Sequence, residues 1–137
     1  MDLTENLEGW QLSFREGWVQ LIQVDFRLGL FFSDGRETAQ LHIGAPCRIS
    51  NVDLDILDPS RPLTLAPALT LFNAEVRSVT IGRTGKLTVE FGDQRTLEVH
   101  PNGPCEAWEL GSPTSRFLFV CTPGGEVALF RQPTPAD

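Results

Sequence analysis

The sequence predicts a mainly β (α+β) fold, in which two pseudo-repeated antiparallel β-meanders pack as a sandwich or barrel with one short connecting helix. Three observations support this prediction. The stretch "FFSDGRETAQLHIGAPCRIS" (31–50) returns in altered form as "EFGDQRTLEVHPNGPCEAWEL" (90–110). Apolar and polar residues alternate in both copies, which is the period of half-buried strands. Between the copies, one segment carries apolar residues at helical spacing.

The strand elements begin at Trp10, where Trp10, Leu12 and Phe14 alternate with polar residues and indicate the first strand. Each copy of the repeat then contains a turn between two alternating runs. The turns "SDGR" (33–36) and "GDQR" (92–95) supply the Asp, Gly and polar residues that reverse a chain between strands. Each half is therefore expected to be a meander of three or four strands, which gives about eight strands in all.

The apolar positions of the two copies align with short gaps. Because each meander has one apolar face, each can bury that face only against the other. The expected core consists of the aligned apolar residues and one tryptophan: Leu28, Leu30, Phe32, Leu41, Ile43, Leu87, Val89, Phe91, Leu97, Val99 and Trp108.

The segment between the copies, "DPSRPLTLAPALTLFNAEV" (58–76), predicts a short helix near 64–73. Leu65, Leu69 and Phe72 fall at i, i+4 and i+7, the spacing of one α-helical face. Thr64 is a suitable N-cap, and Asn73 suits a left-handed stop. The preceding "NVDLDI" (51–56) predicts an edge strand with its apolar residues, Ile56 included, facing inward.

The C-terminal stretch "RFLFVCTPGGEVALFR" (116–131) predicts a hairpin. Pro123 presets φ at the first central turn position, and Gly124 accepts positive φ at the second. We therefore expect one domain over residues 1–137, built of similar halves at about 10–57 and 75–131. Residues 132–137 contain two prolines and are expected to be a flexible tail.

Composition narrows the classes of function. Of the 137 residues 41% are apolar and 21% charged, an ordinary globular balance, and no apolar run is long enough to cross a bilayer. Three cysteines, an odd count, suit a reducing compartment, so a soluble cytoplasmic protein is expected. The net charge of −7 argues against nucleic-acid binding and favours a basic protein partner.

Two histidine–cysteine pairs are the candidates for chemistry. His100 precedes Cys105 by five residues, and His42 precedes Cys47 by the same spacing. A thiolate needs a basic neighbour to act as a nucleophile, and two Cys and two His could in principle hold zinc. However, unpaired Cys is often simply buried, and the short Cys-x2-Cys pairs of zinc sites are missing. The sequence therefore assigns no catalytic residue, no metal and no cofactor.

The peptide "EAWEL" (106–110) is the most distinctive in the chain. Trp108 lies between Glu106 and Glu109, and an indole of this size serves either as a core anchor or as an exposed recognition residue. Both interpretations stay open at this point, with the core anchor favoured.

The chain resembles a family of small bacterial proteins of unknown function. The resemblance rests on the duplicated strand units with their Asp-containing turns, on "EAWEL" and on the final "PGGEVALF" (123–130), and it covers nearly the full length. It implies no assigned activity, cofactor or catalytic residue.

Two classes of function follow from these observations. The first is a non-enzymatic protein-interaction domain of an immunity or regulatory type, with Trp108, Glu106 and Glu109 as contact residues. The alternative is a small-molecule-binding barrel or modest hydrolase that uses the His/Cys pairs. A homodimer built by pairing of edge strands is a third possibility.

Overall fold

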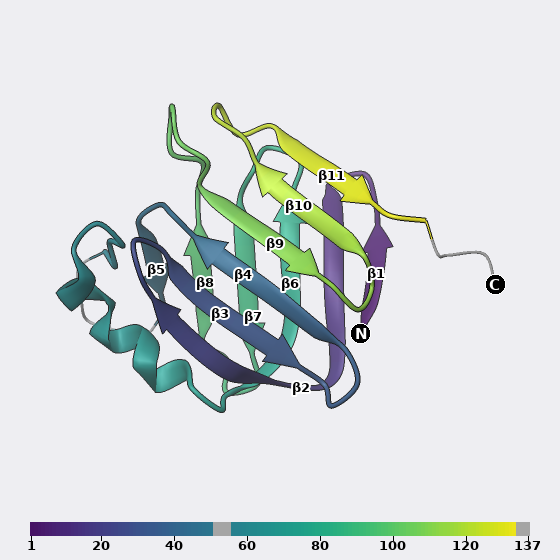
Figure 1. Cartoon of the computed structure of the whole chain (residues 1–137), viewed down its shortest axis with the longest axis horizontal. Coiled ribbons are helices and arrows are strands. Elements are labelled where there is room, and N and C mark those ends of the chain that lie inside the picture. The colour runs from purple at the N-terminus through teal and green to yellow at the C-terminus, as the bar shows by residue number, and fades with distance from the viewer. Residues whose placement is uncertain (51–55, 134–137) are drawn as a thin grey trace.

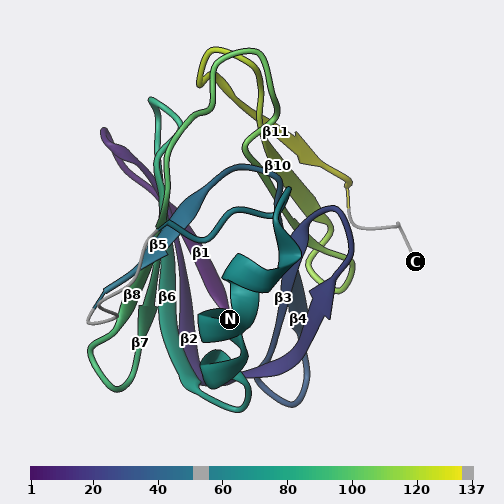
Figure 2. The same cartoon turned by 90° about the vertical axis from the view of Figure 1, so that its left-hand side faces the viewer.

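The computed structural model describes residues 1–50 and 56–133. In these residues eleven strands form one continuous antiparallel sheet that bends into two packed layers (Figures 1 and 2). The elements are β1 (Asp2–Glu5), β2 (Gly9–Val24), β3 (Leu28–Ser33), β4 (Thr38–Ile43), β5 (Cys47–Ile49), the 3₁₀ helix η1 (Pro62–Leu71), β6 (Glu75–Gly82), β7 (Leu87–Phe91), β8 (Thr96–Val99), β9 (Trp108–Ser112), β10 (Phe117–Cys121) and β11 (Val127–Arg131). The predicted fold class is confirmed, and the sheet is open, as in a sandwich, rather than closed into a barrel.

The long strand β2 belongs to both layers. Its first half pairs with β1 and β6, and its second half pairs with β3. The pairing with β6 shifts register between Ser13 and Gly17, which marks the bend. A Cβ at Gly17 would lie 2.7 Å from the Cβ of Phe14, so the bend leaves no room for a side chain there.

The front layer runs in the order β2, β3, β4, β9, β10, β11, and the back layer in the order β1, β2, β6, β7, β8, β5. Figure 1 shows the front strands crossing over the back strands. The predicted meanders lie one in each layer, as β2–β3–β4 and β6–β7–β8. Short strands such as β1 and β5, of four and three residues, raise the total above the expected eight because they are too short to show clear alternation.

The strand that follows each meander crosses to the opposite layer. After β4 the chain passes to the back layer, where β5 pairs with β8, and after β8 it returns to the front, where β9 pairs with β4. In register, Cys47 lies opposite Val99 and Trp108 lies opposite Ile43. Since Ile43 and Val99 are equivalent in the repeat, the structural counterpart of Cys47 is Trp108. The equal His–Cys spacings therefore do not mark Cys47 and Cys105 as structural counterparts, because the two connections differ in length.

All eleven residues predicted for the core are buried, each no more than 1% exposed. They form one cluster between the layers together with residues from β2, η1, β9 and β10. No helix in residues 1–50 and 56–133 has the length and apolar character needed to span a membrane.

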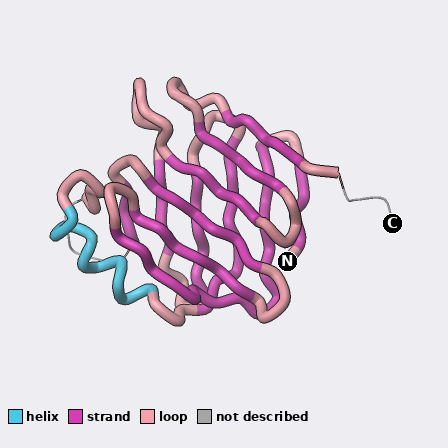
Figure 3. Tube along the Cα trace, viewed as in Figure 1, coloured by secondary structure: helices cyan, strands magenta, loops and turns pink. Residues whose placement is uncertain are grey.

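The connecting helix is present (Figure 3), but its period differs from the prediction. It is a 3₁₀ helix that buries Leu65, Ala68 and Leu71, three residues apart, while Leu69 and Phe72 are exposed. A 3₁₀ helix has three residues per turn, so the buried face follows i, i+3, i+6 rather than the α-helical spacing.

The ends of this segment also differ from the prediction. Thr64 is not the N-cap, which is Arg61; its hydroxyl donates to the carbonyl oxygen of Arg61 at 2.7 Å and accepts from the amide of Asp58 at 2.8 Å. Asn73 has the predicted left-handed conformation, with φ 64°. Of the predicted edge strand, residues 51–55 lie outside the described residues, and Ile56 is exposed whereas Leu57 is buried.

Candidate functional site

The outer faces of the two layers differ sharply in composition. The pairing of residues across neighbouring strands shows that each layer presents two rows of outward side chains. On the front layer the first row is Leu21, Phe31, Gln40, Gly111, Leu118 and Phe130, and the second is Gln23, Gly29, His42, Glu109, Val120 and Ala128. On the back layer the rows are Thr4, Gln11, Thr80, Thr88, Glu98 and Arg48, and Asp2, Ser13, Ser78, Glu90 and Thr96. Every one of those back positions is polar.

The two front rows, which we call the front face, carry six apolar side chains, two glycines, two glutamines and one pair of ionisable groups. Phe130 is 59% exposed and Leu21 is 46% exposed, and the two glycines add no side chain that would screen their neighbours. Apolar side chains on both sides of a sheet cost solubility unless something covers them. The front face is therefore the candidate functional site.

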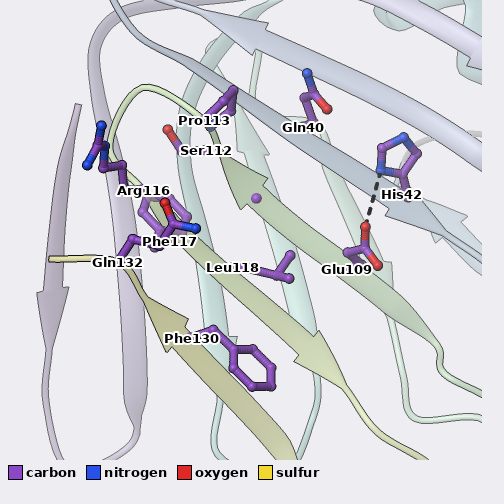
Figure 4. Close-up of a pocket in the computed structure, with 11 residues that line it drawn as sticks. Gln40, His42, Glu109, Ser112, Pro113, Arg116, Phe117, Leu118, Phe130 and Gln132 are labelled. Atoms are coloured by element: carbon purple, nitrogen blue, oxygen red, sulfur yellow. Dashed lines mark ion pairs between the residues drawn. The ribbon is translucent and has the colours of Figure 1, made fainter.

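A hollow of about 440 Å³ lies on the front face over β4, β9, β10 and β11 (Figure 4). Its lining includes Gln40, His42, Glu109, Leu118 and Phe130. Gly111 leaves room in the lining of the hollow: a Cβ built there would lie 3.4 Å from the Cδ1 of Leu118 and 3.7 Å from the carbonyl oxygen of Phe117, which are ordinary contact distances. A larger residue at 111 would occupy part of the hollow without strain in the backbone.

His42 and Glu109 provide the polar centre of the front face. His42 Nδ1 lies 4.0 Å from Glu109 Oε1, and the His42 ring meets Phe31 edge-on with centroids 5.5 Å apart. Burial is the main cause that lowers the pKa of His42, and the charge of Arg27 lowers it further, whereas Glu109 and Asp25 act in the opposite direction. At neutral pH His42 is therefore an uncharged donor and acceptor.

Among the described residues that line the hollow, no hydroxyl is placed to act as the nucleophile of a hydrolase. Ser112, the one hydroxyl in the lining, donates to the carbonyl oxygen of Thr38 at 2.7 Å and accepts from the amide of Ser115. A serine nucleophile requires a base within hydrogen-bond reach. The hydroxyl of Ser112 is instead used to hold the turn after β9.

Trp108 is a core residue. It is 1% exposed, and its Nε1 donates to the carbonyl oxygen of Gly85 at 2.8 Å. This bond ties β9 of the front layer to the turn between β6 and β7 of the back layer. The alternative of an exposed recognition tryptophan is wrong, whereas its neighbours Glu106 and Glu109 do reach the surface.

The two His/Cys pairs are not brought together. Cys47 is buried between the layers, and burial raises its pKa to about 12, so its thiol stays protonated. Cys105 is exposed in the loop before β9, and His100 lies at the exposed end of β8, 3.8 Å from Glu98. Across residues 1–50 and 56–133, no three His, Cys, Asp or Glu side chains are placed to hold a metal ion.

The sequence prediction missed the apolar residues of the front face. Leu118, Val120, Ala128 and Phe130 face outward, so the runs "RFLFVC" and "VALFR" are apolar on both faces of the sheet. Loss of alternation within a predicted outer strand is the signal that could have identified them. The hairpin prediction depends on the turn residues and does not consider this loss of alternation.

Fold and surface together define a small two-layer β-sandwich protein with one polar and one largely apolar outer face. The match to a family of unknown function (DUF6188) extends over residues 10–131, and the chain belongs to this family. Comparison with curated proteins and with solved structures gave no match.

Proposed function

We propose that the protein is a non-enzymatic interaction domain and that the front face is its contact surface for a protein partner. The observation that carries the proposal is the contrast between the two outer faces: eleven polar positions on the back and six apolar side chains on the front. Specific interfaces combine an apolar centre with a few oriented polar groups. The His42–Glu109 pair supplies such groups between the two apolar ends.

The partner that fits this surface has an apolar patch and a net positive charge. The front face contributes little charge of its own, so contact affinity comes from apolar burial. The chain as a whole carries −7 and attracts a basic partner over longer distances. Salt should therefore slow association more than it weakens the assembled complex.

A displayed library of random peptides, selected on the wild-type protein, tests the front face directly and does not require the natural partner to be identified first. Selected peptides should be rich in aromatic and aliphatic residues. Phe130→Glu, which places a charge at the end of the first row, and Gly111→Val, which narrows the hollow, should each weaken binding at least tenfold, about 1.4 kcal/mol. The matched control is Thr88→Glu, at an outward position of the back face.

The control variant should bind the same peptides within about twofold. Peptides that bind equally well to Phe130→Glu and Gly111→Val, or that lose affinity only with Thr88→Glu, would contradict the proposal. Thermal unfolding of each variant confirms that the comparison is made between folded proteins.

A small ligand in the hollow is the second candidate. The observation that favours it is a concave site of about 440 Å³ whose lining combines the apolar Leu118 and Phe130 with the polar Gln40, His42 and Glu109. Ligand-detected NMR with a fragment library distinguishes the two functions. Fragment binding that Gly111→Val abolishes and Leu21→Glu, on the front face but outside the lining of the hollow, leaves unchanged would favour the ligand site over the protein interface.

A further inference from the structure

The outer edge of β11 is an unpaired strand edge. In the described part of the chain β11 pairs with β10 alone. The amide of Thr122 donates to the carbonyl of Glu126 at 2.8 Å, and the amide of Gln132 donates to that of Arg116 at 3.0 Å. Because hydrogen-bonded residues alternate along an antiparallel strand, Val127, Leu129 and Arg131 direct their N–H and C=O groups outward.

Two other strands at sheet edges, β5 and β1, have protection that β11 lacks. β5 has only three residues, and Leu57 covers its outer side by exchanging two main-chain hydrogen bonds with Cys47, at 2.8 and 2.9 Å. β1 carries the carboxylates of Asp2 and Glu5. By contrast β11, "VALFR", has no proline, no acid and no register shift against its neighbour. Edges without such features are the ones that pair with a further strand.

We propose that β11 pairs with β11 of a second copy of this chain, antiparallel and centred on Leu129. In this register Leu129 faces Leu129 of the second copy, and Val127 faces its Arg131. All three outward residues of each copy are then hydrogen-bonded, which gives about six main-chain bonds. A shift of two residues in either direction leaves at least one of these pairs unmade.

The side chains agree with the same register. Phe130 faces Ala128 of the second copy, so a large side chain meets a small one on the outer surface. Glu126 of one copy faces Gln132 of the other copy. Within that other copy, Gln132 pairs with Arg116, just before β10. Strands are about 4.8 Å apart, so Arg116 and Glu126 of the second copy lie about 10 Å apart at Cα, within reach of their long side chains. The twofold axis creates this opposite-charge pair twice.

The dimer extends the proposed function without depending on it. Twofold pairing at β11 joins the two front layers into one sheet and brings the two front faces end to end. The two residues whose single substitutions test it, Glu126 and Arg131, lie outside both rows of the front face and outside the lining of the hollow; Arg116, which lines the hollow, is changed only in the double variant. Loss of peptide binding and loss of dimerisation can therefore be told apart.

Sedimentation velocity between about 5 and 500 µM should show wild-type protein passing from monomer to dimer, as expected for a dissociation constant in the micromolar range. Arg131→Pro removes an outward N–H and leaves the bonds to β10 in place. Glu126→Arg replaces both opposite-charge pairs with like charges. Each variant should raise the dissociation constant at least tenfold.

The double variant Arg116→Glu/Glu126→Arg restores the two charge pairs with exchanged signs and should recover dimerisation to within about threefold of wild type. Circular dichroism and thermal unfolding verify that each variant is folded. A wild-type protein that stays monomeric at 500 µM overturns the proposal. So does a dimer that tolerates both Arg131→Pro and Glu126→Arg, or a double variant that dimerises no better than Glu126→Arg.

Discussion

The two meanders of this protein are alike on the inside and different on the outside. In the front meander Leu28 pairs with Ile43 and Leu30 with Leu41; in the back meander the equivalent pairs are Leu87 with Val99 and Val89 with Leu97. The outward positions between them have diverged. Phe31 and His42 of the front correspond to Glu90 and Glu98 of the back.

This difference shows which positions are needed for the fold and which are free for another role. Inward residues of both copies must fill one shared interior, so size and apolarity are kept. Outward residues contribute little to stability and can vary. Apolar residues occupy outward positions in the front copy of the repeat but not in the back copy. Contact with another molecule explains this difference more simply than a requirement of folding does.

The largest expected effect concerns the shared interior. Phe32 and Phe91 occupy equivalent positions and are 0% and 1% exposed. Replacing either with alanine removes a buried ring and leaves a cavity, so Phe32→Ala and Phe91→Ala should each reduce the free energy of unfolding by about 3–5 kcal/mol. Urea denaturation should give values that agree within about 1 kcal/mol, as expected for equivalent positions.

Losses of this size approach the whole stability of a typical domain. Phe32→Leu and Phe91→Leu, which should cost about 1–2 kcal/mol each, provide the same comparison if the alanine variants do not fold. A loss of several kcal/mol in one copy and almost none in the other would show that the two halves do not share the interior equally.

The second prediction concerns the tie between the layers. Trp108→Phe removes the hydrogen bond to Gly85 that links β9 to the back layer, and it should cost about 1–3 kcal/mol. Trp10 is also buried, but its Nε1 has no hydrogen-bond partner among the described residues. Trp10→Phe removes an unsatisfied donor, which offsets part of the lost contact area.

Trp10→Phe should therefore cost less than about 1 kcal/mol. The ring of Trp10 also packs against Phe119 and the Arg83 guanidinium, and phenylalanine keeps both kinds of contact in weaker form. Chemical denaturation of the two variants side by side tests the difference. Equal losses would mean that contact area alone, and not the bond to Gly85, determines the contribution of Trp108.

Much of the fold was predictable from the sequence because it depends on local alternation. The inward residues, the meanders, the turn at Pro123 and the left-handed Asn73 all followed from the period of apolar residues and from turn chemistry. The helix type was not predictable in this way, because both i, i+3 and i, i+4 sets of apolar residues are present. Only tertiary packing selects Leu65, Ala68 and Leu71.

The candidate site was much less predictable. Glu109 and His42 were identified as candidates, but their pairing depends on β9 crossing back to β4, a long-range contact that no local pattern encodes. Trp108 and Cys47 were conspicuous in sequence and are buried. The front face is visible only after strand order is known, because its rows are assembled from six different strands.

The third prediction exchanges outward residues between the copies. Phe31→Glu and Glu90→Phe interchange the side chains at equivalent outward positions, and each should change the free energy of unfolding by less than about 1 kcal/mol. The fluorescence of an apolar dye such as ANS should fall for Phe31→Glu, because the front face becomes charged, and rise for Glu90→Phe. Dye binding that does not respond to Phe31→Glu would show that the front face is not the accessible apolar surface.

The smallest expected effect is a change in pH dependence at the polar centre of the front face. The pKa of His42 is lowered in the folded protein, so below its ordinary value of about 6.5 the unfolded chain binds more protons. This lowers stability as pH falls through 6.5, and the loss is complete once pH lies below the folded pKa. Above about pH 7 the group contributes no pH dependence.

His42→Gln removes this titration and should make the decrease in stability between pH 7.5 and pH 5 shallower. The change should stay well below about 1 kcal/mol, because one pKa unit corresponds to about 1.4 kcal/mol and solvent screens a partly open side chain. His100→Gln, the same substitution at the exposed end of β8, is the matched control for the replacement itself. A His42→Gln profile that coincides with wild type, or that is steeper, would show that burial and Arg27 do not hold His42 neutral. The front face would then differ from the back face only in which side chains it carries, and not in how burial affects its histidine.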